Sequence, residues 1–446
     1  MQNQFPGQNS AAASHEIPGA ESRPGAPLAY NADGRLEFDG LSVSDLADQF
    51  GTPLYVYSAG TVQKNLAEFQ AGLGGRKHLI CYAVKANSNL ALLRLMQKAG
   101  AGADIVSGGE LFRSLKAGIA PEKIVFAGVG KSAVEIAEAL RADIHMFSVE
   151  SEAELREISR IATAGGHTAR ISIRVNPDVD AVTHPYISTG LKENKFGVSH
   201  EAVPALYDLA GELPGIAPRG IGFHIGSQLL GLDAYRDAAL RVRGLLLDLR
   251  ARGFNITHLD VGGGLGIRYA SEQPPSVTEY VRTMLDVFPN DQPFTDLTFV
   301  FEPGRWLVGN AGVLLTRVLY TKGNAAKHFE IVDAAMNDLI RPSLYSAYHA
   351  VWPDRRERLN TMREADLVGP ICETGDFLAR GRMLPALEQG DVVALASAGA
   401  YGFVMSSNYN SRPRAAEILV ESAAQGPTAR VIRARETYAD LIRGEE

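Results

Sequence analysis

Short apolar runs alternate with amphipathic segments of helical length between residues 79 and 305. Segments 132–142 and 151–164 repeat apolar residues at spacings of three and four, as a helix lying on a sheet does. Strand–helix alternation predicts a parallel sheet, and eight such units over about 230 residues predict an α/β fold, a closed (β/α)8 TIM barrel, with an open doubly wound sheet as the alternative. The expected strands span residues 79–86, 103–107, 123–128, 144–151, 169–177, 220–227, 258–264 and 298–305.

Beyond residue 310 the pattern changes to short strand candidates separated by glycine, proline and aspartate turns. They predict a second, mostly antiparallel β domain, which the strand-like segments 35–40 and 53–58 are expected to join. The candidates span residues 311–323, 327–335, 365–376, 390–402 and 414–422. The expected divisions are a disordered leader at 1–30, N-terminal strands of the β domain at 31–57, the barrel at 58–310 and the C-terminal β domain at 311–446.

Composition narrows the classes of function. The 446 residues suggest two domains or a large barrel with additions, and the leader lacks the apolar core of a signal peptide. The net charge is −7 without a Lys/Arg block, so no nucleic-acid partner is expected. No run of 18 apolar residues occurs, so no membrane span is expected. Cys81 and Cys372 cannot build a disulfide framework, which favours a reducing compartment and a cytoplasmic location.

Polar residues gather where the expected strands end. Barrels of this type place their active-site residues at the carboxyl ends of the strands, and the amino ends here carry nothing comparable. One polar strand end carries little weight, but this many on one face predict a site. The residues are Lys85, Ser107, Glu150, Asn176, His224, Ser227, Gly262, Gly263, Gly264, Glu302 and Arg305.

The glycine-rich segment 260–267 follows the seventh strand, where such barrels commonly bind phosphate. A lysine facing a phosphate site suggests pyridoxal phosphate, whose aldehyde forms a Schiff base with a lysine amine. Glu302 is then a candidate for the pyridine nitrogen and His224 for one face of the ring. Three plainer interpretations stay open: Lys85 marks a strand reaching solvent, the glycines serve a tight turn, and His224 is a core histidine.

Eight motifs together resemble one family, diaminopimelate decarboxylase, within the barrel-type (alanine-racemase-like) class of pyridoxal phosphate enzymes. The resemblance covers roughly residues 35–440. It implies that the chain converts meso-2,6-diaminopimelate to L-lysine and carbon dioxide, the last step of lysine biosynthesis. The motifs, in family order, are "YAVKAN", "HPYISTGLKENKFGV", "FHIGSQ", "GGGLG", "EPGR", "RPSLYSAYH", "CETGDFLA" and "GAYGFVMSSNYN".

The resemblance also implies roles for single residues. Lys85 carries the Schiff base and Cys372 is the proton donor. Together with His224 they form the catalytic set, and no metal site is expected. Cys372 and Glu373 reach the barrel of the partner subunit in a homodimer with shared sites. Cofactor contacts fall on Lys85, His224, Ser227, Gly262, Gly263, Gly264, Glu302, Pro303, Gly304, Arg305 and Tyr401. Substrate contacts fall on Arg305, Arg341, Tyr345, Glu373 and Tyr401.

The chemistry of the substrate agrees with these roles. Diaminopimelate bound by one end still presents a carboxylate and an ammonium at the other. Arg341 with Tyr345 suits the carboxylate, because a guanidinium can bind both oxygens, and Glu373 suits the ammonium. The related enzymes that decarboxylate ornithine or arginine bind substrates without a distal carboxylate, so they do not need an arginine at this position. Two other classes stay as rivals: a catalytically dead binding protein, which would typically lose Lys85 or Cys372, and an alanine racemase, which would lack "CETGD" and "HIGSQ".

Overall fold

The computed structural model describes residues 26–179, 195–324 and 327–445. Most of the expected leader and much of the "HPYISTGLKENKFGV" motif lie outside these ranges. Strand β1 (Leu28–Tyr30) is an exception, because it falls inside the segment predicted to be disordered and pairs with β2 (Leu36–Phe38). The prediction for residues 28–30 is therefore wrong, since ladder bonds to β2 order them.

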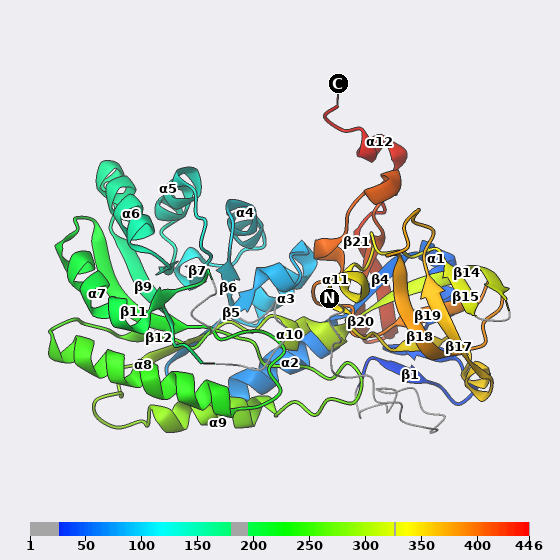
Figure 1. The fold of residues 1–446 in the computed structure, drawn as a ribbon, viewed down its shortest axis with the longest axis horizontal. Coiled ribbons are helices and arrows are strands. Elements are labelled where there is room, and N and C mark those ends of the chain that lie inside the picture. Colours follow the sequence, from blue (N-terminus) through cyan, green and yellow to red (C-terminus); the bar gives the residue numbers. More distant parts are fainter. Residues whose placement is uncertain (1–25, 180–194, 325–326, 446) are drawn as a thin grey trace, which may run out of the picture.

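Eight parallel strands close into a barrel, which forms the left half of the molecule in Figure 1. Pairing runs in chain order, and the ladder from β13 to β5 closes the ring. The closed (β/α)8 barrel is confirmed, and the open sheet is excluded. The strands are β5 (His78–Ala83), β6 (Gly102–Ile105), β7 (Ile124–Phe126), β8 (Met146–Val149), β9 (Ala169–Asn176), β11 (Ile216–Phe223), β12 (His258–Asp260) and β13 (Thr298–Phe301).

The surrounding helices follow from local sequence signals, as α5 (Ala133–Ala142) illustrates. Ser132 and Glu135 form a capping box at its start, which satisfies amide groups that a helix leaves free. Ile136 and Leu140 point one face into the core. The other barrel helices are α2 (Ala59–Gly72), α3 (Leu90–Lys98), α4 (Gly108–Lys116), α6 (Glu152–Gly165), α7 (Val203–Glu212), α8 (Asp233–Ala251) and α9 (Val277–Val287).

A mostly antiparallel β domain packs beside the barrel, on the right of Figure 1. Strand β4 (Leu54–Ser58) from the N-terminal part lies between two strands of the C-terminal part, antiparallel to β14 and parallel to β20. The second domain and its N-terminal strand are confirmed. Its other strands are β14 (Gly312–Gly323), β15 (His328–Val332), β16 (Val351–Pro353), β17 (Met362–Val368), β18 (Phe377–Pro385), β19 (Val392–Leu395), β20 (Ala416–Ala423) and β21 (Gly426–Arg433).

Some details of the β domain differ from the sequence pattern. Segment 35–40 does form a strand, β2, but it pairs with β1 and β3 (Leu41–Ser42) in a separate small sheet instead of the main one. Its Leu36 and Phe38 still share a buried cluster with Leu54 of β4. The strand expected at 365–376 ends at Val368. Strand β18 follows it and was not predicted, because its arginines and glycine interrupt the apolar alternation that marks a strand.

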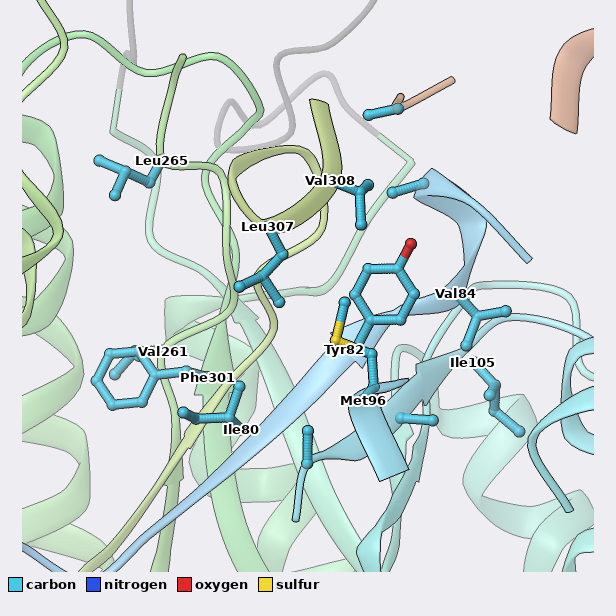
Figure 2. Close-up of a cluster of buried hydrophobic side chains, with 14 of the residues drawn as sticks. Ile80, Tyr82, Val84, Met96, Ile105, Val261, Leu265, Phe301, Leu307 and Val308 are labelled. Carbon is cyan, nitrogen blue, oxygen red and sulfur yellow. The ribbon is translucent and has the colours of Figure 1, made fainter. Parts of the chain in front are cut away.

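Apolar side chains of the barrel strands pack against helical residues, among them Met96 of α3 and Leu307 and Val308 of α10 (Arg305–Val308) (Figure 2). Ile80 and Tyr82 of β5 lie beside Phe301 of β13, and all three are buried. Strand β5 ends at Ala83, earlier than predicted, and Val84–Ala86 forms one 3-10 turn. The packed core thus fixes the turn that presents Lys85. Along the described ranges no helix combines the length and apolar character needed to cross a bilayer.

Candidate active site

A cavity of about 440 Å³ opens at the carboxyl ends of the barrel strands and is closed on one side by the β domain. Its walls bring together residues from the ends of four barrel strands and the loops after them, and from the C-terminal part of the chain. Most of the residues expected at the site are here: Lys85, His224, Ser227, Gly263, Gly264, Glu302, Pro303, Gly304, Arg305, Arg341, Tyr345 and Tyr401. Gly262 lies directly beside it, against His224.

Lys85 enters the cavity from the turn after β5. Its Nζ lies 2.8 Å from Oδ2 of Asp104, whose side chain is fully buried, whereas the lysine side chain is 40% exposed. Burial lowers the pKa of Lys85, but the carboxylate of Asp104 outweighs it, so the pKa lies above its usual range. The lysine is therefore held by one carboxylate while its amine stays open to a ligand.

Glu302 and Asp260 form a second buried acidic group at the ends of β13 and β12. Burial, with the charges of Asp104 and Asp260 nearby, raises the pKa of Glu302 well above its usual range. Two adjacent carboxyl groups resist losing both protons, and the backbone N–H of Gly262 donates to Asp260 at 2.9 Å. Glu302 is thus the protonated member of the pair.

The imidazole of His224 is neutral. Burial, followed by the charges of Arg174 and Lys85, lowers its pKa well below the usual value. The N–H of Gly263 donates to its Nδ1 at 3.2 Å, which places the ring proton on Nε2. A neutral, half-buried ring of fixed orientation at the cavity wall suits contact with a flat aromatic ligand.

The glycines of the loop after β12 are required by close packing. A Cβ on Gly263 would lie 2.1 Å from the carbonyl oxygen of Glu302. Gly264 has a φ of +102°, and a Cβ there would lie 2.1 Å from the carbonyl oxygen of Gly226. Both glycines line the cavity, so the loop offers it bare backbone.

Arg305 is buried and only partly satisfied. Its guanidinium donates to Tyr269 Oη at 2.6 Å and to Ser227 Oγ at 3.2 Å, and its Cζ lies 4.7 Å from the centre of the Tyr401 ring. Its Nε has no hydrogen-bond partner in the ranges that the structure covers. No salt bridge of Arg305 occurs there either. A buried cation that lines the cavity and has hydroxyl and ring partners fits an anionic ligand.

Arg341 brings a second buried guanidinium from the β domain. It begins helix α11 (Arg341–Tyr345), is 6% exposed, and lies with its Cζ 4.7 Å from the centre of the Tyr269 ring. Tyr269 thus contacts both Arg305 and Arg341. The cavity thus holds two guanidinium groups beside one tyrosine, a set of side chains that suits anionic groups of a ligand.

Cys372 and Glu373 do not reach this cavity. Both lie in the loop between β17 and β18, and Cys372 is exposed. Asn410 Oδ1 accepts the N–H of Cys372 at 2.9 Å, and the Tyr409 hydroxyl donates to Glu373 at 2.7 Å. Within the described part of the chain neither side chain is among the residues that line the cavity. The barrel of the same subunit therefore does not receive them.

Comparisons with known proteins agree with this geometry. The family model of the pyridoxal-dependent decarboxylases, pyridoxal binding domain, matches residues 59–309. A diaminopimelate decarboxylase of Pseudomonas aeruginosa is 52% identical over 413 residues, which is 93% of this chain and 97% of the relative. The chain belongs to the diaminopimelate decarboxylases.

Further members of the diaminopimelate decarboxylases match over similar lengths. The protein of Vibrio cholerae is 49% identical over 412 residues, or 92% of this chain and 97% of its own. The crystal structure of the Helicobacter pylori enzyme complexed with L-lysine has a TM-score of 0.84 at 44% identity, covering 90% of this chain and 98% of that one. The family expected from the motifs is confirmed, as are the fold expected from the strand–helix alternation and the pyridoxal phosphate cofactor expected from the strand ends.

Several residues at the site of this diaminopimelate decarboxylase were not expected. Asp104 contacts Lys85, Tyr269 contacts both arginines, and Gln228 and Glu272 also line the cavity. An acidic residue inside an apolar strand was a usable signal for Asp104. Tyr269 lies in an irregular loop, where no periodicity marks it.

Proposed function

We propose that the chain removes the carboxylate from the D-configured centre of meso-2,6-diaminopimelate and releases L-lysine and carbon dioxide. The observation that carries this proposal is the pair of buried arginines, Arg305 and Arg341, in the same cavity as Lys85. A substrate with an amino-acid group at each end has two carboxylates to place. A site for ornithine would need only one such cation.

The cavity fits pyridoxal phosphate by the chemistry of its donors. Lys85 would hold the cofactor through its amine. The Ser227 hydroxyl, to which Arg305 donates at 3.2 Å, and the bare backbone at Gly263 would receive the phosphate. Glu302 would hold the ring nitrogen through its carboxyl group. When bound, the cofactor supplies an electron sink for the charge left by the departing carbon dioxide.

Arg341 would hold the distal carboxylate. Its guanidinium comes from the β domain, whereas Lys85 comes from the barrel, so the two can bind opposite ends of one ligand. Tyr345 and Tyr401 line the same cavity and would add contacts to the substrate. A charge-assisted pair in a buried site is stronger than one in water, and this difference would reject substrates that lack the second carboxylate.

The active enzyme would be a homodimer with shared sites. Decarboxylation leaves an α-carbon that must take up a proton, and a thiol can act as the general acid. Since Cys372 and Glu373 are remote from the cavity of their own subunit, we assign these roles to the partner's Cys372 and the partner's Glu373. The two free cysteines suit a reducing compartment, and we propose the cytoplasm.

Product analysis tests the proposed reaction. The purified holoenzyme is incubated separately with meso-diaminopimelate, ornithine, arginine and lysine, and carbon dioxide and the amino products are measured. We expect carbon dioxide and L-lysine in equal amounts from diaminopimelate, at a rate at least about 10³-fold above the other substrates. Equal rates on diaminopimelate and ornithine would refute the substrate assignment. Lys85→Ala serves as the inactive control.

A further inference from the structure

Beneath Arg341 lies a fully buried histidine, His349, to which the mechanism above gives no role. Its Nε2 is 3.0 Å from a terminal nitrogen of Arg341, and its Nδ1 is 2.8 Å from the carbonyl oxygen of Ala396. Its side chain is 0% exposed, and its ring meets the Tyr269 ring edge-on at 5.6 Å. The histidine is thus in contact with two of the residues that shape the distal anion position.

The two neighbours of His349 dictate its protonation state. A carbonyl oxygen can only accept, so Nδ1 must carry the proton that it donates to Ala396. A guanidinium can only donate, so Nε2 must offer a lone pair to Arg341. Burial, followed by the charge of Arg341, lowers the pKa of His349 to about 3, which agrees with this neutral tautomer. His349 therefore acts as an uncharged acceptor.

The position of His349 is fixed from several sides. The amide of Ala396 donates to the carbonyl of Ala350 at 2.9 Å, which continues the pairing of β16 with β19 and holds the acceptor for Nδ1 in place. The guanidinium of Arg382 donates to the backbone carbonyl of His349 at 2.8 Å and packs 3.8 Å from the centre of the Tyr348 ring. Both ring nitrogens and the backbone carbonyl of His349 are therefore each held by a hydrogen bond.

The charge of Arg341 remains available to a ligand because its protein partners are neutral. Over the ranges described, Arg341 forms no salt bridge, and it contacts the His349 imidazole and Tyr269, with the positive charge of Arg305 nearby. Elsewhere in the β domain, arginines near buried acids are neutralised: Arg363 pairs with Glu330 and Arg433 with Glu417, whose side chains are both fully buried. A carboxylate at position 349 would occupy Arg341 in the same way.

We propose that His349 is a positioning residue, which orients the guanidinium of Arg341 without neutralising it and so keeps its charge for the distal carboxylate of substrate and product. This inference rests on the carboxylate role of Arg341 proposed above. His349 thereby contributes to specificity, because it strengthens the binding of ligands that carry the distal carboxylate and leaves the binding of ligands that lack it unchanged.

Variants at position 349 separate the hydrogen bond from the charge. His349→Gln keeps an uncharged acceptor that can reach Arg341, and His349→Glu has the same shape with a negative charge. His349→Asn keeps a donor near Ala396 but loses the acceptor. For each holoenzyme, inhibition constants are measured for L-lysine, which retains the distal carboxylate, and for 1,5-diaminopentane, which lacks it. Steady-state constants are measured with diaminopimelate.

We expect His349→Glu and His349→Asn to raise the inhibition constant of L-lysine by about ten- to a hundredfold, as for loss of a charge-assisted contact. The inhibition constant of 1,5-diaminopentane should not change. In these two variants KM for diaminopimelate should rise more than kcat falls. In His349→Gln the inhibition constant of L-lysine should stay within about threefold of the wild-type value. The matched control is His258→Gln, which removes a partly buried imidazole at the amino end of β12 and should leave both inhibitors unaffected.

The outcomes distinguish this inference from the proposed function. If Arg341→Ala abolishes the preference for L-lysine over 1,5-diaminopentane but His349→Glu and His349→Asn keep it, the role of His349 is wrong and that of Arg341 stands. If Arg341→Ala also keeps the preference, the carboxylate role itself is wrong. Circular dichroism and bound-cofactor absorbance check folding. Should His349→Asn not fold, the Gln and Glu variants, which differ only in charge, decide.

Discussion

The proposed sharing of active sites can be tested by mixing two inactive subunits. Lys85→Ala removes the amine from the cavity, and Cys372→Ala removes the thiol from the exposed loop between β17 and β18. If the thiol serves the partner's cavity, each homodimer of either variant has two broken sites. A dimer with one subunit of each kind has one intact site and one site that lacks both groups.

The expected activity follows from counting sites. Random pairing of equal amounts gives about half mixed dimers, and half of the sites in a mixed dimer are intact. The mixture should therefore recover about one quarter of the activity of the same amount of wild-type dimer. If Cys372 served its own barrel, every site in every dimer would lack either the lysine or the cysteine, and the recovery would be zero.

The assay starts from the two purified variants, which are unfolded together, refolded with pyridoxal phosphate and assayed for carbon dioxide release from diaminopimelate. Each variant refolded alone is the control for reversion or contamination. A mass tag on one variant reports the fraction of mixed dimers. Mixed dimers formed at about half of the total, with no activity above that of the parents, would refute the shared site.

Three further outcomes are expected. Lys85→Ala should abolish both turnover and the visible absorbance of bound cofactor; retention of either contradicts its assignment. Gly263→Ala, whose Cβ would lie 2.1 Å from the carbonyl oxygen of Glu302, should weaken cofactor binding by about tenfold or more in a fluorescence titration, and unchanged affinity contradicts the packing argument. Burial, with His145 nearby, lowers the pKa of His258 to about 4, so the folded state needs this ring neutral. Stability should therefore be full above about pH 6.5 and fall by about 2 kcal/mol as the pH drops towards 4, after allowance for partial exposure. Urea denaturation of wild type and His258→Gln measures this, and equal pH slopes for the two proteins contradict it.

The barrel and most of its site are predictable because the signals are local. Each strand is a short apolar run, and parallel strands in a closed ring must bring their carboxyl ends together. Lys85, His224 and Glu302 lie far apart in the sequence, yet this rule alone places them in one cavity, as the structure does. The boundary of β5 was predicted less well, since a 3-10 turn after Ala83 has the same apolar composition as the strand.

The contacts between site residues are not predictable in this way. Asp104 lies within an expected strand, and only the register that opposes Ala83 to Asp104 brings its carboxylate next to Lys85. His349 belongs to a recognised motif, but its role depends on Ala396, which a different strand segment supplies. Cys372 and Glu373 are a third case, because the cavity proposed for them belongs to another copy of the chain.

The position of β4 between β14 and β20 also has a consequence for how the protein is made. Ribosomes add about 5–20 residues per second, so β20 emerges about 20 to 70 s after β4. The barrel can complete its ring of strands in that interval, because all eight precede residue 302. Until β14 and β20 arrive, the nascent chain carries the five-residue apolar strand β4 with both edges unpaired. During synthesis, this N-terminal strand is therefore open to association with the wrong partner until the C-terminal strands arrive.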